Sequence, residues 1–232
     1  DRLMMEHALR HAVANGEMEL HYQPQVSLTT GAITGMEALL RWTHPRMGKI
    51  APAQFIPLAE ETGLIVPIGE WAFMRSCCEG KALQDELGME LTISVNLSPR
   101  QFQQKNLVQV IEHSLAKSGL AASHLEIEIT EGILMVNSHD NLDKLQKIRE
   151  LGARISIDDF GTGFCSFSYL LQYQVDRLKI DQSFVRQAET DVNAASVVRT
   201  IIAMSHGLNI KVVAEGVETD EQLRFLLRRK CD

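Results

Sequence analysis

The stretch that decides the fold is ISIDDFGTG, residues 155–163. Its first three residues have the apolar pattern of a short buried strand. Two adjacent carboxylates, Asp158 and Asp159, follow at once, and then a Gly-Thr-Gly segment that can turn sharply. Neighbouring acids repel one another and resist burial unless a cation lies between them. A strand that ends in acids and opens into a loop is typical of α/β enzyme sites, and an Asp-rich solvated turn is the alternative.

Strands and helices alternate around this stretch. Strands alternating with helices indicate a parallel sheet. The predicted strands are residues 90–96, 124–129, 154–157, 177–180 and 211–214, and the predicted helices between and after them are residues 107–118, 141–151, 166–172, 194–206 and 221–229.

The amino-terminal part adds two strands, which gives seven, one fewer than an eight-stranded barrel needs. Because a turn at residues 29–31 separates them, we expect a hairpin, so that one early strand runs antiparallel to its neighbours. We expect residues 1–232 to form a single domain, whose leading helical segment, residues 1–16, links it to an upstream domain. The remaining assignments are strands at residues 19–26 and 32–42, a loop at 45–52, and helices at 1–14, 53–62 and 66–87.

Composition narrows the functional class. The chain has 232 residues, 45% of them hydrophobic and 23% charged, which suits one large α/β barrel or two small domains. A net charge of −7 argues against a polymeric nucleic acid as partner, although bound divalent metals could still recruit a small phosphorylated ligand. The four cysteines, Cys77, Cys78, Cys165 and Cys231, lack the spacing of a zinc site. With no signal peptide and no bilayer-length apolar run, we expect a cytoplasmic domain, whose parent protein could be membrane-anchored.

Polar residues recur at the downstream ends of the predicted strands. One acid after a strand is most often a helix cap or part of a solvated turn. Carboxyl ends of barrel strands converge, however, and these residues offer oxygen donors that suit Mg²⁺ or Mn²⁺ better than zinc. So many acids would serve two metals about 4 Å apart, as in phosphoester cleavage. Lys179 among them is open to three interpretations: a salt-bridge strut, a phosphate contact or a water-orienting group. The residues are Glu37, Asn96, Glu128, Glu131, Asp158, Asp159, Lys179, Asp181, Glu215 and Glu218.

Seven motifs, in order, resemble those of the EAL phosphodiesterases, which open the second messenger cyclic di-GMP. The resemblance spans nearly the whole chain and implies a TIM-like (β/α)8 barrel with hydrolysis of cyclic di-GMP to linear pGpG. It also implies two Mg²⁺ or Mn²⁺ ions per site and inhibition by Ca²⁺. The motifs are YQP (22–24), MEALLRW (36–42), SVNLS (94–98), EIEITE (126–131), DDFGTG (158–163), LKID (178–181) and AEGVET (214–219).

The resemblance also implies residue roles. Lys179 would contact the attacking water and Glu131 would hold the Gly-Thr-Gly loop. Glu37, Asp159 and Glu215 would share the catalytic role with Lys179, and no protein nucleophile is needed. The implied metal ligands are Glu37, Asn96, Glu128, Asp158, Asp159 and Glu215, and the implied substrate contacts are Gln23, Arg41, Asn96, Asp181 and Glu218.

The sequence departs from the family pattern twice. Residues 164–167 are FCSF, where the family tends to have a tyrosine, small residues and a leucine, in a segment often found at a dimer interface. After Lys230-Cys231-Asp232 the family continues with a Gln-Gly stretch and a last strand, so we expect the last barrel strand to be missing here.

The resemblance leaves a choice of functions. It implies cyclic di-GMP as ligand, a homodimer, and an upstream sensor or GGDEF-type cyclase domain in the parent chain. One alternative is a catalytically silent cyclic di-GMP receptor or protein-interaction domain. Another is an unrelated metal-dependent barrel enzyme that acts on a different phosphate or enolate. Silent members usually lose metal-site residues, and every position that can be matched is intact, which favours the enzyme.

Overall fold

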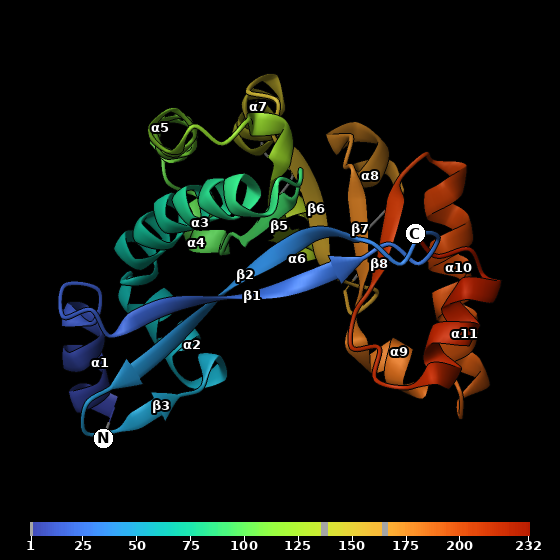
Figure 1. Cartoon of the computed structure of the whole chain (residues 1–232), viewed down its shortest axis with the longest axis horizontal. Helices are drawn as coiled ribbons and strands as arrows, with labels where there is room; N and C mark the ends of the chain where they lie inside the picture. The colour runs from blue at the N-terminus through green and yellow to red at the C-terminus, as the bar shows by residue number, and fades with distance from the viewer. Residues whose placement is uncertain (1, 136–138, 164–166) are drawn as a thin grey trace. The chain divides into compact units, whose positions relative to one another are not determined.

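The computed structural model describes residues 2–135, 139–163 and 167–232. The chain divides into two compact units. Unit 1 comprises Asp1–Gln25 and Thr34–Leu125, and unit 2 comprises Val26–Ile33 and Glu126–Asp232. Helices and strands alternate along most of the chain (Figure 1). The departure from the family pattern at Phe164–Ser166 lies outside the described residues.

Unit 1 contains most of both strands of the amino-terminal hairpin, whose turn belongs to unit 2, and the first parallel pair of strands. β1 and β2 run antiparallel, with Thr43 N donating to Glu17 O at 3.0 Å, whereas β2 and β4 are parallel, with Glu37 opposite Ser94. The elements are α1 (Arg2–His11), β1 (Met18–Val26), β2 (Ile33–His44), β3 (Gly48–Ile50), α2 (Pro52–Thr62), α3 (Ile65–Leu87), β4 (Thr92–Asn96), α4 (Pro99–Phe102), α5 (Leu107–Ser118) and the 3₁₀ turn η1 (Ala122–His124).

The core of unit 1 is built around Trp42 of β2. Its indole is 1% exposed and meets the ring of Phe55 edge to face, with centroids 5.6 Å apart. The indole N–H donates to Glu17 Oε2 at 3.0 Å, which satisfies the polar edge of the buried ring. The end of β2 is thereby held against α2.

Unit 2 contains four parallel strands that pair in chain order, which confirms the predicted parallel sheet. Among the described residues no strand follows β8. The elements are β5 (Leu125–Thr130, whose first residue belongs to unit 1), α6 (Glu131–Met135), α7 (His139–Glu150), β6 (Arg154–Phe160), α8 (Phe167–Tyr173), β7 (Arg177–Ile180), α9 (Gln182–Gln187), α10 (Val192–Gly207), β8 (Lys211–Ala214) and α11 (Asp220–Arg228).

The two faces of the unit 2 sheet differ in chemistry. Residues alternate along β5 and β6, so that Ile127, Ile129, Ile155 and Ile157 share one face and are at most 1% exposed. The opposite face carries charged side chains that are equally buried. Parallel sheets covered on both faces usually have apolar strands throughout. The buried charges are therefore the feature of this sheet that needs a functional explanation.

The largest differences from the predicted strands are an added strand and a lengthened one. The loop predicted at residues 45–52 is wrong in part, because β3 forms there, antiparallel to the end of β2. His44 Nδ1 accepts from the backbone N–H groups of Arg46 and Met47, and Gly48 takes φ +71°, which closes a tight turn. A three-residue strand is too short for periodicity to detect, and the described chain has eight strands instead of seven. β6 also extends to Phe160 and includes both acids, with a shift of register after Ile157.

Cys77, Cys78 and Cys231 are free thiols, and Cys165 lies outside the described residues. Across the described ranges, none of the helices combines the length and the apolar character needed to cross a bilayer.

Candidate active site

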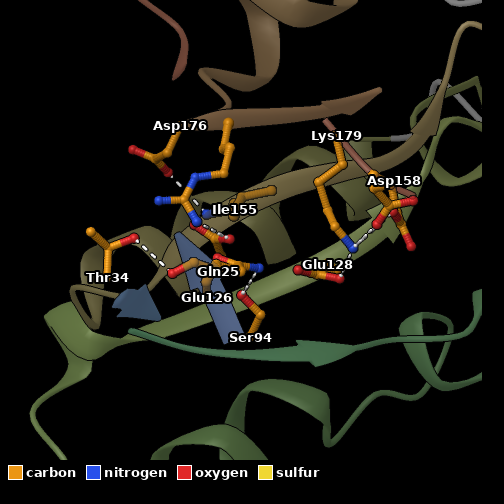
Figure 2. A network of polar contacts seen from close by, with 11 residues as sticks. Gln25, Thr34, Ser94, Glu126, Glu128, Ile155, Asp158, Asp176 and Lys179 are labelled. Carbon is orange, nitrogen blue, oxygen red and sulfur yellow. Dashed lines mark hydrogen bonds and ion pairs between the residues drawn. The ribbon is translucent and has the colours of Figure 1, made fainter. Parts of the chain in front are cut away.

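The candidate site in unit 2 is centred on the ammonium group of Lys179, a residue that is 1% exposed. Its Nζ lies 2.6 Å from Glu128 Oε2, 3.0 Å from Asp158 Oδ1 and 2.8 Å from Glu215 Oε1. Figure 2 shows the lysine side chain reaching between Glu128 and Asp158. The carboxylates come from β5, β6 and the residue after β8. They lie close together because the carboxyl ends of parallel strands lie at one edge of a sheet.

The charges in this cluster do not cancel. When all four groups are ionised, three carboxylates and one ammonium sum to −2. Glu128 is fully buried, and Asp158 and Glu215 are 16% and 25% exposed in their side chains, so solvent screens the excess only in part. A divalent cation would neutralise it. The donor set, carboxylate oxygens alone, suits Mg²⁺ or Mn²⁺.

A fourth carboxylate, that of Asp159, adjoins the cluster. Oxygen atoms of Asp158, Asp159 and Glu215 lie within 4.8 Å of one another, close enough to share a metal ion. Asp159 as a whole is exposed, but partial burial of its carboxyl raises its pKa to about 6, and the charges of Asp158 and Asp181 add to the rise. Asp159 also takes a left-handed φ of +52°, which turns the backbone at the shift of register.

The Gly-Thr-Gly segment is held by Glu131 at the start of α6. Gly161 N donates to Glu131 Oε1 at 2.7 Å. A side chain at Gly163 would put its Cβ only 2.5 Å from Glu131 Oε2, so the carboxylate lies directly against the glycine. Thr162 Oγ1 donates back to Asp159 O at 2.8 Å. These contacts determine the course of the backbone just after the two acids.

A buried ion pair also lies on the charged face of the sheet. Arg177 donates to Glu126 at 2.9 Å, and the Glu126 side chain is fully buried. Asp176 accepts from Ile155 N at 2.9 Å and from Arg149 at 3.0 Å. Sequence reasoning missed the pair of Glu126 and Arg177, because the residues are 51 positions apart and neither follows the end of a strand.

In unit 1 the structure brings two predicted ligands together. Asn96 Nδ2, at the end of β4, donates to Glu37 Oε1 on β2 at 2.7 Å. The parallel register of the two strands places both side chains on the same face. The amide thereby orients the carboxylate of Glu37.

The residues predicted to contact substrate are more dispersed. Gln23 is exposed on β1, and Arg41 of β2 is half-buried, with Nη1 donating to Leu40 O at 2.9 Å. Asp181 caps α9 by accepting from Ser183 N at 3.0 Å. Glu218 is exposed and pairs with Arg186 at 2.7 Å.

The fold and the site together define an α/β protein whose parallel strands end in a cation-deficient cluster of carboxylates. The chain belongs to the EAL domain family, whose sequence pattern it matches over residues 6–232. The predicted family assignment is therefore confirmed.

The chain resembles both curated proteins and solved structures of this family. It is 43% identical to the bifunctional diguanylate cyclase/cyclic di-GMP phosphodiesterase MucR of Pseudomonas aeruginosa, over 100% of this chain and 34% of that protein. It is 41% identical to the cyclic di-GMP phosphodiesterase NbdA of the same organism, over 99% of this chain and 29% of that protein. The chain thus spans about a third of the length of these relatives.

The structure of the PaMucR phosphodiesterase in complex with c-di-GMP matches with a TM-score of 0.95 and 43% identity, over 99% of this chain and 93% of that one. This likeness confirms the predicted fold class, an α/β fold of TIM-like barrel type with an early antiparallel strand and without a last strand.

Proposed function

We propose that this chain hydrolyses cyclic di-GMP to linear pGpG. The observation that carries the proposal is the cluster of Glu128, Asp158 and Glu215 around Lys179, which retains an excess negative charge. The names of MucR and NbdA, and the c-di-GMP complex of PaMucR, support cyclic di-GMP as the substrate.

The proposed cofactor is a pair of Mg²⁺ or Mn²⁺ ions, with Ca²⁺ as an inhibitor. Bound cations would supply a Lewis acid for activating water and for neutralising charge on the phosphodiester. Asp158, Asp159 and Glu215 offer oxygen atoms close enough to share one ion. Glu128, Glu37 and Asn96 are proposed as further ligands, on the resemblance of their motifs to those of the family.

The chain's own groups can position substrate and move protons. Lys179 donates to Glu128 and forms ion pairs with Asp158 and Glu215, which keeps the three carboxylates close together in spite of their mutual repulsion. Asp159, with a pKa of about 6, can exchange a proton near neutral pH. We propose four substrate contacts on the resemblance of their motifs to those of the family: Gln23, Arg41, Asp181 and Glu218. The guanidinium of Arg41 suits a phosphate oxygen. A homodimer within a longer, multidomain signalling protein is the proposed assembly.

One assay tests the function. The protein is incubated with cyclic di-GMP and Mg²⁺, and pGpG is measured by chromatography. We expect product with the unaltered chain and a loss of at least about a hundredfold in rate for Asp158→Asn, because the amide weakens the proposed metal ligand set. Lys211→Met, which removes an exposed lysine on β8, is the control and is expected to retain activity. Tight binding of cyclic di-GMP without any product would refute hydrolysis and identify a receptor instead.

A further inference from the structure

Helix α9 contacts the two loops of unit 2 that come directly after clustered carboxylates. It begins directly after β7, where Asp181 caps it, and Val185 buries its inner side with 1% exposure. One loop follows Asp158 and Asp159, and the other follows Glu215. No role for this helix was evident in the sequence, because its contacts are with glycines 23 and 34 positions away.

The first contact is between Phe184 and Gly161. Gly161 has φ +102°, and a Cβ placed there would be 2.9 Å from Phe184 Cε2 and 3.3 Å from Ile201 Cδ1. The aromatic ring therefore presses directly on the backbone two residues after Asp159. Glu131 holds the N–H group of the same glycine at 2.7 Å. The carboxylate and the ring together determine the position of this peptide.

The second contact is between Gln182 and Gly216. Gly216 has φ +66°, and a Cβ placed there would be 2.7 Å from Gln182 Cβ. The backbone next to Glu215 thus rests on the first residue of α9. Further along the same loop, Thr219 Oγ1 donates to Glu189 at 3.1 Å, just after the helix.

We propose that Gln182 and Phe184 are positioning residues that set the separation between the Asp158–Asp159 pair and Glu215. Like charges this close repel one another when no cation is bound, so the loops need a rigid support to remain ready for metal. A helix of six residues, capped at Asp181 and buried at Val185, supplies that support to both loops at once. The inference rests on the proposed metal-binding function.

The test measures metal affinity, not turnover. Metal-free protein is titrated with MnCl₂ by calorimetry. Phe184→Ala is expected to weaken Mn²⁺ binding at least about tenfold, since a displacement of the order of 1 Å in a supporting contact loosens a ligand set. Phe184→Leu, which keeps apolar bulk, should recover most of the affinity. Val185→Ala is the control: it removes buried volume from α9 at a residue that does not contact Gly161 or Gly216, so it should lower Tm and leave Mn²⁺ affinity within about twofold.

The second contact has a matched glycine control. Gly216→Ala would force a Cβ against Gln182, whereas Gly119→Ala, with a similar φ of +73°, meets nothing within 4 Å. Both substitutions carry the same backbone strain, so only Gly216→Ala should weaken Mn²⁺ binding by about tenfold or more.

The outcomes separate the two proposals. Unchanged affinity in Phe184→Ala and Gly216→Ala, or an equal loss in Val185→Ala, would overturn the positioning role. If Phe184→Ala does not fold, Phe184→Leu is the deciding variant. A folded Phe184→Leu protein that binds Mn²⁺ as weakly as unfolded protein would contradict the role of apolar bulk at this position. An unaltered protein that binds Mn²⁺ but releases no pGpG would refute the phosphodiesterase and leave the positioning role standing.

Discussion

At the scale of single residues, Lys179 is the internal counterion of the site. Its ammonium lies within 3.0 Å of three carboxylates that would otherwise repel one another, and it brings a positive charge into direct contact with all three. Two requirements meet in this residue. We expect the metal-free protein to need the lysine for stability, and a bound cation would take over the same task.

Replacing Lys179 by methionine separates these requirements. Without metal, we expect Lys179→Met to destabilise the protein by about 3–5 kcal/mol, because three carboxylates lose the buried ammonium that lies within 3.0 Å of each of them. Added Mg²⁺ should restore much of the loss. Thermal unfolding in EDTA and in Mg²⁺ measures both effects, with Lys211→Met as the control that changes neither. A metal-free Lys179→Met protein as stable as the parent would contradict the counterion role.

We expect Asp159 to make the proposed metal binding depend on pH. Its pKa is raised from 3.8 to about 6, so the native state holds this proton more tightly than the unfolded chain. The stabilising effect is therefore complete below about pH 4 and is lost as the pH rises to about 6. Metal must displace the proton, so affinity should fall up to about tenfold per pH unit below pH 6.

Calorimetric titration with Mn²⁺ at several pH values between 5 and 8 checks this expectation. Asp159→Asn serves as the control, because it should bind metal more weakly at pH 8 and lose this part of the pH dependence. An unaltered slope in the variant would assign the dependence to another group.

At the scale of elements, sequence periodicity was sufficient for the parallel strands of unit 2. Strands β5, β6 and β7 alternate apolar with polar residues, β8 is a short apolar run after Lys211, and polar residues stand out toward or just after their carboxyl ends. Glu128, Asp158, Lys179 and Glu215 could be singled out in this way, because a strand end has a local signature.

Contacts between distant elements have no such signature. The three residues of β3 are fewer than any periodic pattern requires, and α9, with six residues, is short as well. The contact of Phe184 with Gly161 depends on the path of the chain through β7, which a single sequence does not reveal. The same is true of the pair formed by Arg177 and Glu126.

At the scale of the whole molecule, bound metal should act as a ligand of the folded state alone. At a free Mg²⁺ concentration a hundred times Kd, the stabilisation is about 2.7 kcal/mol. For a chain of 232 residues this corresponds to a rise in Tm of about 5–10 °C. Thermal scans with Mg²⁺ and with EDTA measure the difference. Asp158→Asn should lose most of the rise, and an equal rise in that variant would indicate non-specific binding of Mg²⁺.

The alternation of isoleucines and charges in β5 and β6 has a consequence for folding. Ile127 lies opposite Ile155, and Glu128 lies opposite Ser156. A slip of one residue between these strands would place Glu126 and Glu128 on the buried apolar face and move their apolar neighbours away from it. Mispaired intermediates of this kind would bury uncompensated charge and would therefore be unstable. We therefore expect the buried acids of β5 to help select the native alignment of β5 and β6 during folding, before any ligand binds.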